Sequence, residues 1–383
     1  MRVVYSIGSR LAGGGIGDTA YHAARSIFAA GHLARLFCLG YQPTDIPEDL
    51  ICSLWFPSRR YLRFAPMRYY WLKDRSFDRR AARRLPEAFD VFHGWSSHSL
   101  ACLRKAKERG AVAFVERGSA HSAVQARLLE EEHERFGLRP PRAMARLVER
   151  CLAEYEATDY VHVPSSFCRQ SFLELGYPES RLVQSPYGVD ASRFSPRAEP
   201  ARFTALFVGE IGLRKGALDL LEAWSRLRLS DSRLVLLGGV EPAVARLVDE
   251  YRQRGTFETP GFSRDVAAAY AGSSVLVLPA IEDGFPLVVL EAMASGRPVI
   301  VSENTGSKDA VREGVNGFVV PIRSPDAIAA RLQWLHDHPA ERAEMGREAR
   351  GQAERFTWER YGESLVGMYE DKLAIKEGGI RNP

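Results

Sequence analysis

The sequence predicts two doubly wound α/β domains that face each other across a cleft, and three observations support this. The chain has 383 residues, which is long for one compact domain and fits two of roughly 150 to 200 residues. Short β-branched runs alternate with helix-length segments, as in parallel sheets with crossover helices. Residues 194–200 contain two prolines and no apolar periodicity, so they form the best linker. We therefore expect domains over residues 1–195 and 201–357.

The elements follow in the order that such domains require. In the first domain we expect an opening strand, a helix, a second strand and a later strand at residues 3–7, 19–30, 33–39 and 111–115. The second domain has strands separated by helix-length segments at residues 203–208, 233–237, 275–278, 298–301 and 317–320. A ligand of such a pair binds at the carboxyl ends of the strands, in the cleft between the domains.

The composition excludes several classes of protein. No stretch approaches the roughly 18 uninterrupted apolar residues of a membrane span, and residues 1–8 have the pattern of a buried strand rather than a signal peptide. Five cysteines are scattered without C-x-x-C spacing, which disfavours a disulfide framework and a zinc ribbon. We expect a cytoplasmic protein.

Basic residues are concentrated in one segment, residues 59–84. It holds ten Lys and Arg against Asp74 and Asp78, a local charge of +8 in a chain whose net charge is +4. Six aromatic residues are interleaved with the cations, a composition suited to anionic lipid headgroups. The alternative is a solvated basic helix whose aromatic rings pack on the domain beneath. Nucleic acid is not expected, because a nucleic-acid module would leave two α/β domains without a role.

A glycine-rich loop follows the first strand. Gly15, Gly17 and Ala20 satisfy the relaxed G-x-G-x-x-A dinucleotide pattern, but the pattern starts about seven residues after the strand. No Asp or Glu lies between Asp18 and Asp45, so the carboxylate that binds a ribose is missing and a nicotinamide enzyme is not expected. The loop at Gly14 and Gly15 offers backbone N–H groups to an anion or a sugar, unless it is a simple connection.

Two cations mark the corresponding turn of the second domain. The strand 203–208 is followed by Gly209, and Arg214 and Lys215 stand just before a helix expected over residues 217–227. Cations at a helix N-terminus oppose the helix dipole, so a negative group should compensate them. A diphosphate would do so, with Arg214 as a planar fork and Lys215 as a point charge. The alternative is a basic turn that faces solvent.

An acidic loop lies between the strand 275–278 and a helix that begins near Pro286. Asp283 in the loop and Glu291 on the helix are eight residues apart, so both can accept hydrogen bonds from the hydroxyl groups of one ligand. The helix N-terminal amides would face a phosphate. Alternatively, Glu282 or Asp283 caps the helix and Glu291 is a surface glutamate.

Taken together and in this order, these motifs resemble the family 4 glycosyltransferases, which are retaining enzymes of the GT-B fold. The resemblance spans nearly the whole chain. It rests on residues 14–15 through 31–32, 90–93, 163–166, 186–194, 209–216, 283–298, 314–321 and 356–358, with Tyr369. It implies two Rossmann-like domains, and a last helix at about residues 358–374 that packs back on the first domain.

The resemblance also implies roles for single residues. Asp283, in place of the usual Glu, would contact the donor sugar, Glu291 the nucleoside ribose and Lys215 the donor diphosphate. Glu210 stands where the family often has an Arg, so Arg214 is expected to substitute for it. The remaining donor-binding positions are Gly209, Gly284, Phe285, Pro286 and Leu287.

In the first domain, Arg117 takes the place of the family's His before Gly118. Arg117 and His121 are then catalytic candidates, and His93 at the end of the preceding strand is a candidate on the acceptor side.

No Asp-x-Asp motif occurs in the sequence, so we expect no metal and no cofactor. The expected reaction is retaining transfer from a nucleotide-diphosphate sugar to a glycan, lipid-linked or small-molecule acceptor, at the inner face of the membrane if residues 59–84 touch lipid. The departures at Asp283, Glu210 and Arg117 keep a catalytically silent nucleotide-sugar-binding protein open. A GT-B phosphorylase or epimerase is a further alternative.

Overall fold

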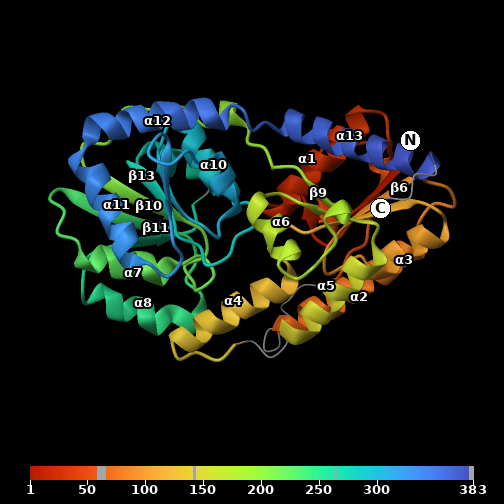
Figure 1. Ribbon diagram of the computed structural model, residues 1–383, viewed down its shortest axis with the longest axis horizontal. Coiled ribbons are helices and arrows are strands. Elements are labelled where there is room, and N and C mark those ends of the chain that lie inside the picture. Colours follow the sequence, from red (N-terminus) through yellow and green to blue (C-terminus); the bar gives the residue numbers. More distant parts are fainter. Residues whose placement is uncertain (58–65, 141–143, 264, 379–383) are drawn as a thin grey trace.

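The computed structural model describes residues 1–57, 66–140, 144–263 and 265–378, and contains two parallel sheets, each covered by helices (Figure 1). The first sheet has the order β5-β3-β1-β6-β7-β8-β9. Its strands are β1 (Val3–Ser6), β3 (Leu33–Cys38), β5 (Ile51–Ser53), β6 (Val91–Trp95), β7 (Val112–Glu116), β8 (Tyr160–Val163) and β9 (Leu182–Gln184). The order reverses between β1 and β6, so this sheet has a topological switch point there.

Helices cover both faces of this sheet, as the βαβ pattern requires. They are α1 (Ile16–Ala29), α2 (Pro66–Ala82), α3 (Leu100–Glu108), α4 (Ser122–Arg135), α5 (Met144–Ala157) and α6 (Ser166–Leu173). A small parallel pair, β2 (Arg10–Leu11) with β4 (Gly40–Tyr41), lies beside the glycine-rich loop. Of the basic segment, residues 66–82 form α2, while residues 58–65 lie outside the described part of the chain.

The second sheet has the order β12-β11-β10-β13-β14-β15, with parallel pairing throughout. Its strands are β10 (Phe203–Val208), β11 (Ser232–Leu237), β12 (Glu258–Gly261), β13 (Val275–Leu278), β14 (Val299–Ser302) and β15 (Gly317–Val320). Its helices are α7 (Ala217–Arg226), α8 (Ala245–Arg252), α9 (Val266–Ala271), α10 (Leu287–Ala294), α11 (Pro325–Asp337) and α12 (Pro339–Ala353). The switch point lies between β10 and β13. The predicted fold class, two doubly wound α/β units, is confirmed.

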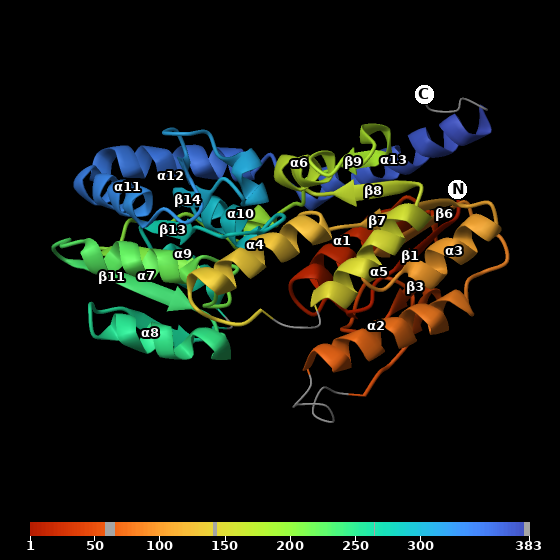
Figure 2. The ribbon, with the colours of Figure 1, turned by 60° about the horizontal axis from the view of Figure 1, so that its bottom comes forward.

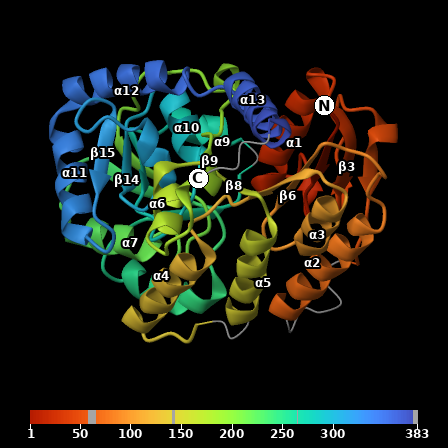
Figure 3. The same ribbon diagram turned by 45° about the vertical axis from the view of Figure 1, so that its right-hand side comes forward.

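Two helices tie the halves of the chain together. The last helix, α13 (Trp358–Glu377), returns to the first half and packs against α1 (Figure 3). The contact is close enough that a Cβ at Gly362 would overlap Ser26. On the other side, α4 runs from the first sheet toward α7 (Figure 2), where Arg135 pairs with Asp219 at 2.6 Å.

The strands that the sequence predicted are the buried ones. Val275–Leu278 and its neighbours are wholly inaccessible, because helices cover both faces of a parallel sheet. Several strands were not predicted: the short strands β2, β4, β5 and β9, together with β8 and β12. The strand β8 contains His162, and β12 is an edge strand that holds Pro260, so neither has an uninterrupted apolar run. Among the helices of the described residues, none is long and apolar enough to cross a membrane.

Candidate functional site

The two cations predicted to hold a phosphate stand where β10 ends and α7 begins. Gly216 caps α7 in the left-handed conformation (φ 67°), and a Cβ there would overlap the carbonyl oxygen of Pro279. Glycine is therefore required both by the turn and by the close approach of the loop after β13. This approach brings Arg214 and Lys215 next to the acidic loop at the switch point of the second sheet.

The Lys215 ammonium donates to the Asp283 carboxylate, and Arg214 lies 3.9 Å from the same carboxylate. Burial acts to raise the pKa of Asp283, but Lys215 and Arg214 outweigh it, so the pKa is lowered overall. Both cations keep an outlet to solvent, since 35% of the Arg214 side chain and 16% of the Lys215 side chain are exposed. A carboxylate and two cations of this kind form a ready anion site.

The Glu282 side chain makes different contacts from the side chain of Asp283. It is fully buried and accepts from the backbone N–H of Ala120 at 2.8 Å and from the Gln125 side-chain amide at 2.6 Å. Arg214 also donates to the Glu282 backbone carbonyl at 3.1 Å. Glu282 therefore fixes the acidic loop of the second half onto the start of α4 in the first half. It does not replace Asp283 as a ligand-facing carboxylate.

Glu291 lies on α10, one turn from its start. The Tyr270 hydroxyl donates to it at 2.8 Å. Burial raises the pKa of Glu291; Tyr270 and Arg193 counter the shift, and the Asp18 carboxylate adds to it. Asp18 belongs to α1, so the glycine-rich loop of the first half lies within electrostatic range of Glu291 across the junction.

The glycine-rich loop is open to solvent. Gly14 and Gly15 are exposed, with φ values of 90° and 55°, and Gly15 stands at the N-terminus of α1. The Gly14 N–H donates to the Asp18 carboxylate at 3.0 Å. The Gly14 N–H is thus occupied by Asp18, and the prediction that the loop binds an anion or a sugar stays a prediction.

The other donor-binding candidates form the junction itself. A Cβ at Gly284 would overlap the carbonyl of Gly118, so the two loops meet here with no room for a side chain. Phe285 is buried against Tyr187, with ring centroids 5.7 Å apart, and Pro286 caps α10, which Leu287 begins. Gly209 ends β10 at φ 144°, with the Lys215 stem 3.9 Å from where its Cβ would be.

Of the three first-half candidates, His93 and His121 are buried and Arg117 is partly exposed. Arg117 donates to the carbonyl of Ala120 at 2.9 Å and to Gln125 at 2.7 Å, so it shapes its own loop. His121 is buried and caps α4 through its ring nitrogen, which accepts from the Ala123 N–H at 3.2 Å. Burial, with a smaller effect of Arg117, lowers the pKa of His121 to about 4.

His93 is fully buried and shares hydrogen bonds with Glu116 and Tyr369 at 3.1 Å and 2.7 Å. The prediction that His93 lies on the acceptor side is therefore corrected, since it is inaccessible to any acceptor in this structure. The same applies to His121 as a residue that faces the cleft, because its ring packs against Tyr155 and Phe172.

Comparison with known proteins decides the family. Residues 13–193 match the family described as Glycosyltransferase Family 4, and residues 189–352 match Glycosyl transferases group 1. A D-inositol 3-phosphate glycosyltransferase of Geodermatophilus obscurus is 30% identical over 319 residues, covering 76% of this chain and 68% of that protein. The chain belongs to the family 4 glycosyltransferases. A second D-inositol 3-phosphate glycosyltransferase, from Nocardiopsis dassonvillei, is 28% identical and covers 76% of this chain and 72% of its own length.

Solved structures share the fold of this glycosyltransferase. A sucrose-phosphate synthase from Thermosynechococcus elongatus superposes with a TM-score of 0.72 at 19% identity, covering 98% of this chain and all of that one. Anabaena HepE, solved in complex with UDP-glucose, gives 0.69 at 13% identity, covering 97% of this chain and all of HepE. At these identities the likeness shows the fold alone, and that fold is GT-B.

Two contributors to the site of this glycosyltransferase were missed from sequence. Tyr270 holds Glu291, and Ser165 donates to the Gly284 carbonyl at 2.8 Å across the junction. Ser165 lies in a motif that carried the family resemblance, which was the available signal. Nothing local to Tyr270, on the short helix α9, points to Glu291, because that contact is made only by the fold.

Proposed function

We propose that this glycosyltransferase moves a sugar from a nucleotide-diphosphate donor with retention of configuration and without a metal ion. The observation that carries the proposal is the convergence of Lys215, Arg214 and Asp283 at the switch point of the second sheet. Glu291 lies eight residues from Asp283 on the adjoining helix. Anabaena HepE, which has the same fold, was solved with UDP-glucose, which supports a donor of this class.

The two cations, Lys215 and Arg214, would stabilise the diphosphate as it leaves the sugar. In the structure, Asp283 neutralises Lys215. A diphosphate would take over that role and leave Asp283 to accept from sugar hydroxyls, with Glu291 on the ribose. As the bond from the anomeric carbon to the diphosphate oxygen breaks, Lys215 and Arg214 stabilise the charge on the leaving oxygen. The acceptor oxygen then bonds to the anomeric carbon on the face that the diphosphate leaves, and its proton passes to the leaving phosphate.

Donor binding is tested by thermal stabilisation with UDP-, GDP-, ADP- and dTDP-sugars, with chelator present and NAD as the control. Ligand at about a hundred times its dissociation constant should add roughly 2.7 kcal/mol to stability. A shift with one nucleotide series names the donor. A shift with NAD alone, or a shift that requires added divalent cation, contradicts the proposal. The anomeric configuration of the transferred sugar, measured by NMR, tests retention.

We further propose that the acceptor lies at an anionic membrane surface, contacted by helices α2, α3 and α5 at the inner face. A groove of about 580 Å³ between these helices is lined by Arg75, Arg79, Arg104, Arg146 and Arg150, with Asp78 and Glu149 as its acidic residues. The Arg75 guanidinium lies over the Trp71 ring at 5.0 Å. Phe77, in contrast, is fully buried, so part of the aromatic set packs on the domain beneath.

Vesicle co-sedimentation tests the proposed contact with an anionic membrane. Binding should grow with the fraction of anionic lipid, weaken with salt, and fall in an Arg79→Glu, Arg104→Glu variant. The matched control is Arg246→Glu, an exposed arginine on α8 of the other sheet. If binding to vesicles does not depend on the fraction of anionic lipid, the proposal of a membrane-associated acceptor is wrong.

A further inference from the structure

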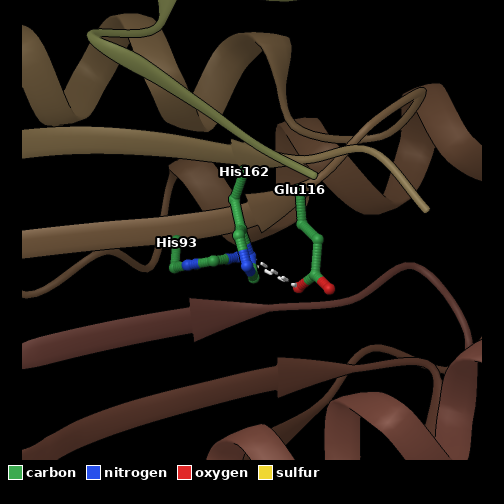
Figure 4. Close-up of side chains that lie close together, drawn as sticks. All are labelled: His93, Glu116 and His162. Atoms are coloured by element: carbon green, nitrogen blue, oxygen red, sulfur yellow. Dashed lines mark hydrogen bonds and ion pairs between the residues drawn. The ribbon is translucent and has the colours of Figure 1, made fainter. Parts of the chain in front are cut away.

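Three neighbouring strands of the first sheet bring together two histidines and a glutamate that the transfer reaction does not use. His93 lies on β6, Glu116 ends β7, and His162 lies on β8 (Figure 4). Glu116 and His162 are direct partners in the ladder between β7 and β8. All three side chains are 0% exposed. The His93 Nε2 atom lies 3.1 Å and the His162 Nδ1 atom 3.8 Å from the same oxygen, Oε2 of Glu116.

The outward atoms of all three side chains are held by hydroxyl groups. The second ring nitrogen of His93, Nδ1, bonds to the Tyr369 hydroxyl at 2.7 Å, and that of His162, Nε2, to the Ser185 hydroxyl at 2.8 Å. The second oxygen of Glu116 accepts from the Tyr187 hydroxyl at 2.8 Å. Metal-binding histidines are oriented in this way, with the nitrogen that does not bind the ion held by a hydrogen bond.

The inward side of the cluster is only partly satisfied by the protein: Glu116 Oε2 shares a hydrogen bond with His93 Nε2 at 3.1 Å and accepts from the Tyr5 hydroxyl at 3.3 Å. His162 Nδ1 is buried and has no hydrogen-bond partner, although it points at the Glu116 carboxylate (Figure 4). The Tyr361 hydroxyl is likewise buried without a hydrogen-bond partner, and its ring stacks on His162 with centroids 6.3 Å apart. Burying a polar group without a hydrogen-bond partner is unfavourable, because the group loses its bonds to water and gains none in return. A group that bonds to them inside the cluster would remove this cost.

We propose that His93 Nε2, Glu116 Oε2 and His162 Nδ1 bind one divalent transition-metal ion, with Zn²⁺ as the expected ion. Two ligand atoms of a tetrahedral zinc site lie about 3.3 Å apart, close to the 3.1 and 3.8 Å found here. Two imidazoles and one carboxylate suit zinc, whereas Mg²⁺ and Ca²⁺ favour all-oxygen sites. One carboxylate also offsets part of the ion's charge in an interior that water does not reach. The Tyr361 hydroxyl, which is buried without a hydrogen-bond partner and whose ring stacks on His162, is the side chain that we propose for the fourth position.

The ion is structural. Tyr361 and Tyr369 both belong to α13, so the site fastens the returning helix onto β6, β7 and β8. Its ligands lie on the first sheet, whereas Lys215, Asp283 and Glu291 belong to the second half. The site therefore takes no part in binding the donor diphosphate, and its failure would leave the proposed transfer reaction untouched.

The full-length protein, purified without chelator or added metal, tests the proposal by elemental analysis. The expected content is about one zinc ion per chain. Protein stripped of metal and given Co²⁺ should show the visible absorption of a tetrahedral site. Metal-free protein that takes up no Co²⁺ would overturn the proposal and identify the cluster as a hydrogen-bonded network alone. Neither measurement depends on a variant.

Variants locate the ion. His162→Gln and Glu116→Gln should each lower the zinc content at least tenfold and abolish the Co²⁺ spectrum. His32→Gln is the matched control, because this partly exposed histidine lies near Glu370, outside the cluster, and it should retain the wild-type content. If both cluster variants fold and keep their zinc, the ion lies elsewhere and the proposal is wrong.

Discussion

Both sheets gather ionisable side chains at the carboxyl ends of their strands, but the two edges differ in what those side chains contact. At the first edge, His93, Glu116 and His162 are inaccessible and held by tyrosine and serine hydroxyls. At the second, Lys215 and Arg214 face a carboxylate and keep an outlet to solvent. An incoming anion can take the place of Asp283, whereas the Glu116 side chain is fully buried and its partners are other buried side chains. The difference teaches that exchangeable partners, rather than the presence of ionisable residues, mark the donor site.

The largest expected effect is that of Lys215→Ala, which removes the cation at the second edge. Loss of a preorganised charge that acts on the transition state costs about 3 kcal/mol, or roughly a hundredfold in kcat/KM. Steady-state transfer with the donor identified by thermal shift measures the loss. Arg246→Ala, which removes a cation that is 90% exposed on α8, is the control and should be neutral. Wild-type activity in Lys215→Ala would show that the two edges do not differ in this way.

Glu291→Ala should also remove most turnover, by about 2 kcal/mol, because in the proposed reaction this carboxylate binds the donor ribose. The substitution also leaves the buried Tyr270 hydroxyl unpaired. Glu291→Gln keeps an acceptor for Tyr270 and separates the two causes. Glu258→Ala, an exposed carboxylate on β12, serves as the control. Donor affinity and turnover unaffected in both Glu291 variants would exclude a role at the ribose.

The junction between the halves is tested by Gly284→Ala. The added methyl group would overlap Gly118, so we expect a loss of about 1 to 2 kcal/mol in the free energy of unfolding, with activity lost along with it. In Gly351→Ala, on the exposed face of α12, the methyl group meets no atom within 4 Å. That variant should gain about 0.5 to 1 kcal/mol. Thermal unfolding of both variants compares their stabilities. It distinguishes steric overlap at residue 284 from an effect that any glycine-to-alanine substitution would have.

The smallest expected effect is on the pH dependence of stability, and it comes from the buried His121. The folded pKa of His121 is about 4, below its ordinary value of 6.5. Its contribution to stability is therefore complete above about pH 6.5 and is lost as the pH falls toward 4. His121→Asn keeps a capping side chain on α4 without the titration, so the stability lost between about pH 7 and pH 5 should shrink by about 1 kcal/mol. Equal pH dependence in both proteins, by urea unfolding, would contradict this.

Much of the donor side was predictable because it is local. The strand, turn and helix around Lys215 and the loop and helix around Asp283 and Glu291 are continuous segments, and a switch point brings the ends of such segments together. The first half resisted prediction for the opposite reason. His121 and His93 have the residue types of an active site, and only their partners, which come from distant segments, show that they are buried in the protein.

By itself, the sequence determined the fold class, the family and the positions of the donor-side residues. These depend on apolar runs, on glycines at tight turns and on spacings within one segment, which are properties of neighbouring residues. The tertiary structure alone decided that Glu282 anchors the junction while Asp283 pairs with Lys215, and that His93, Glu116 and His162 form one buried cluster. Burial and hydrogen bonding between segments far apart in the chain set these outcomes, and no local pattern encodes them.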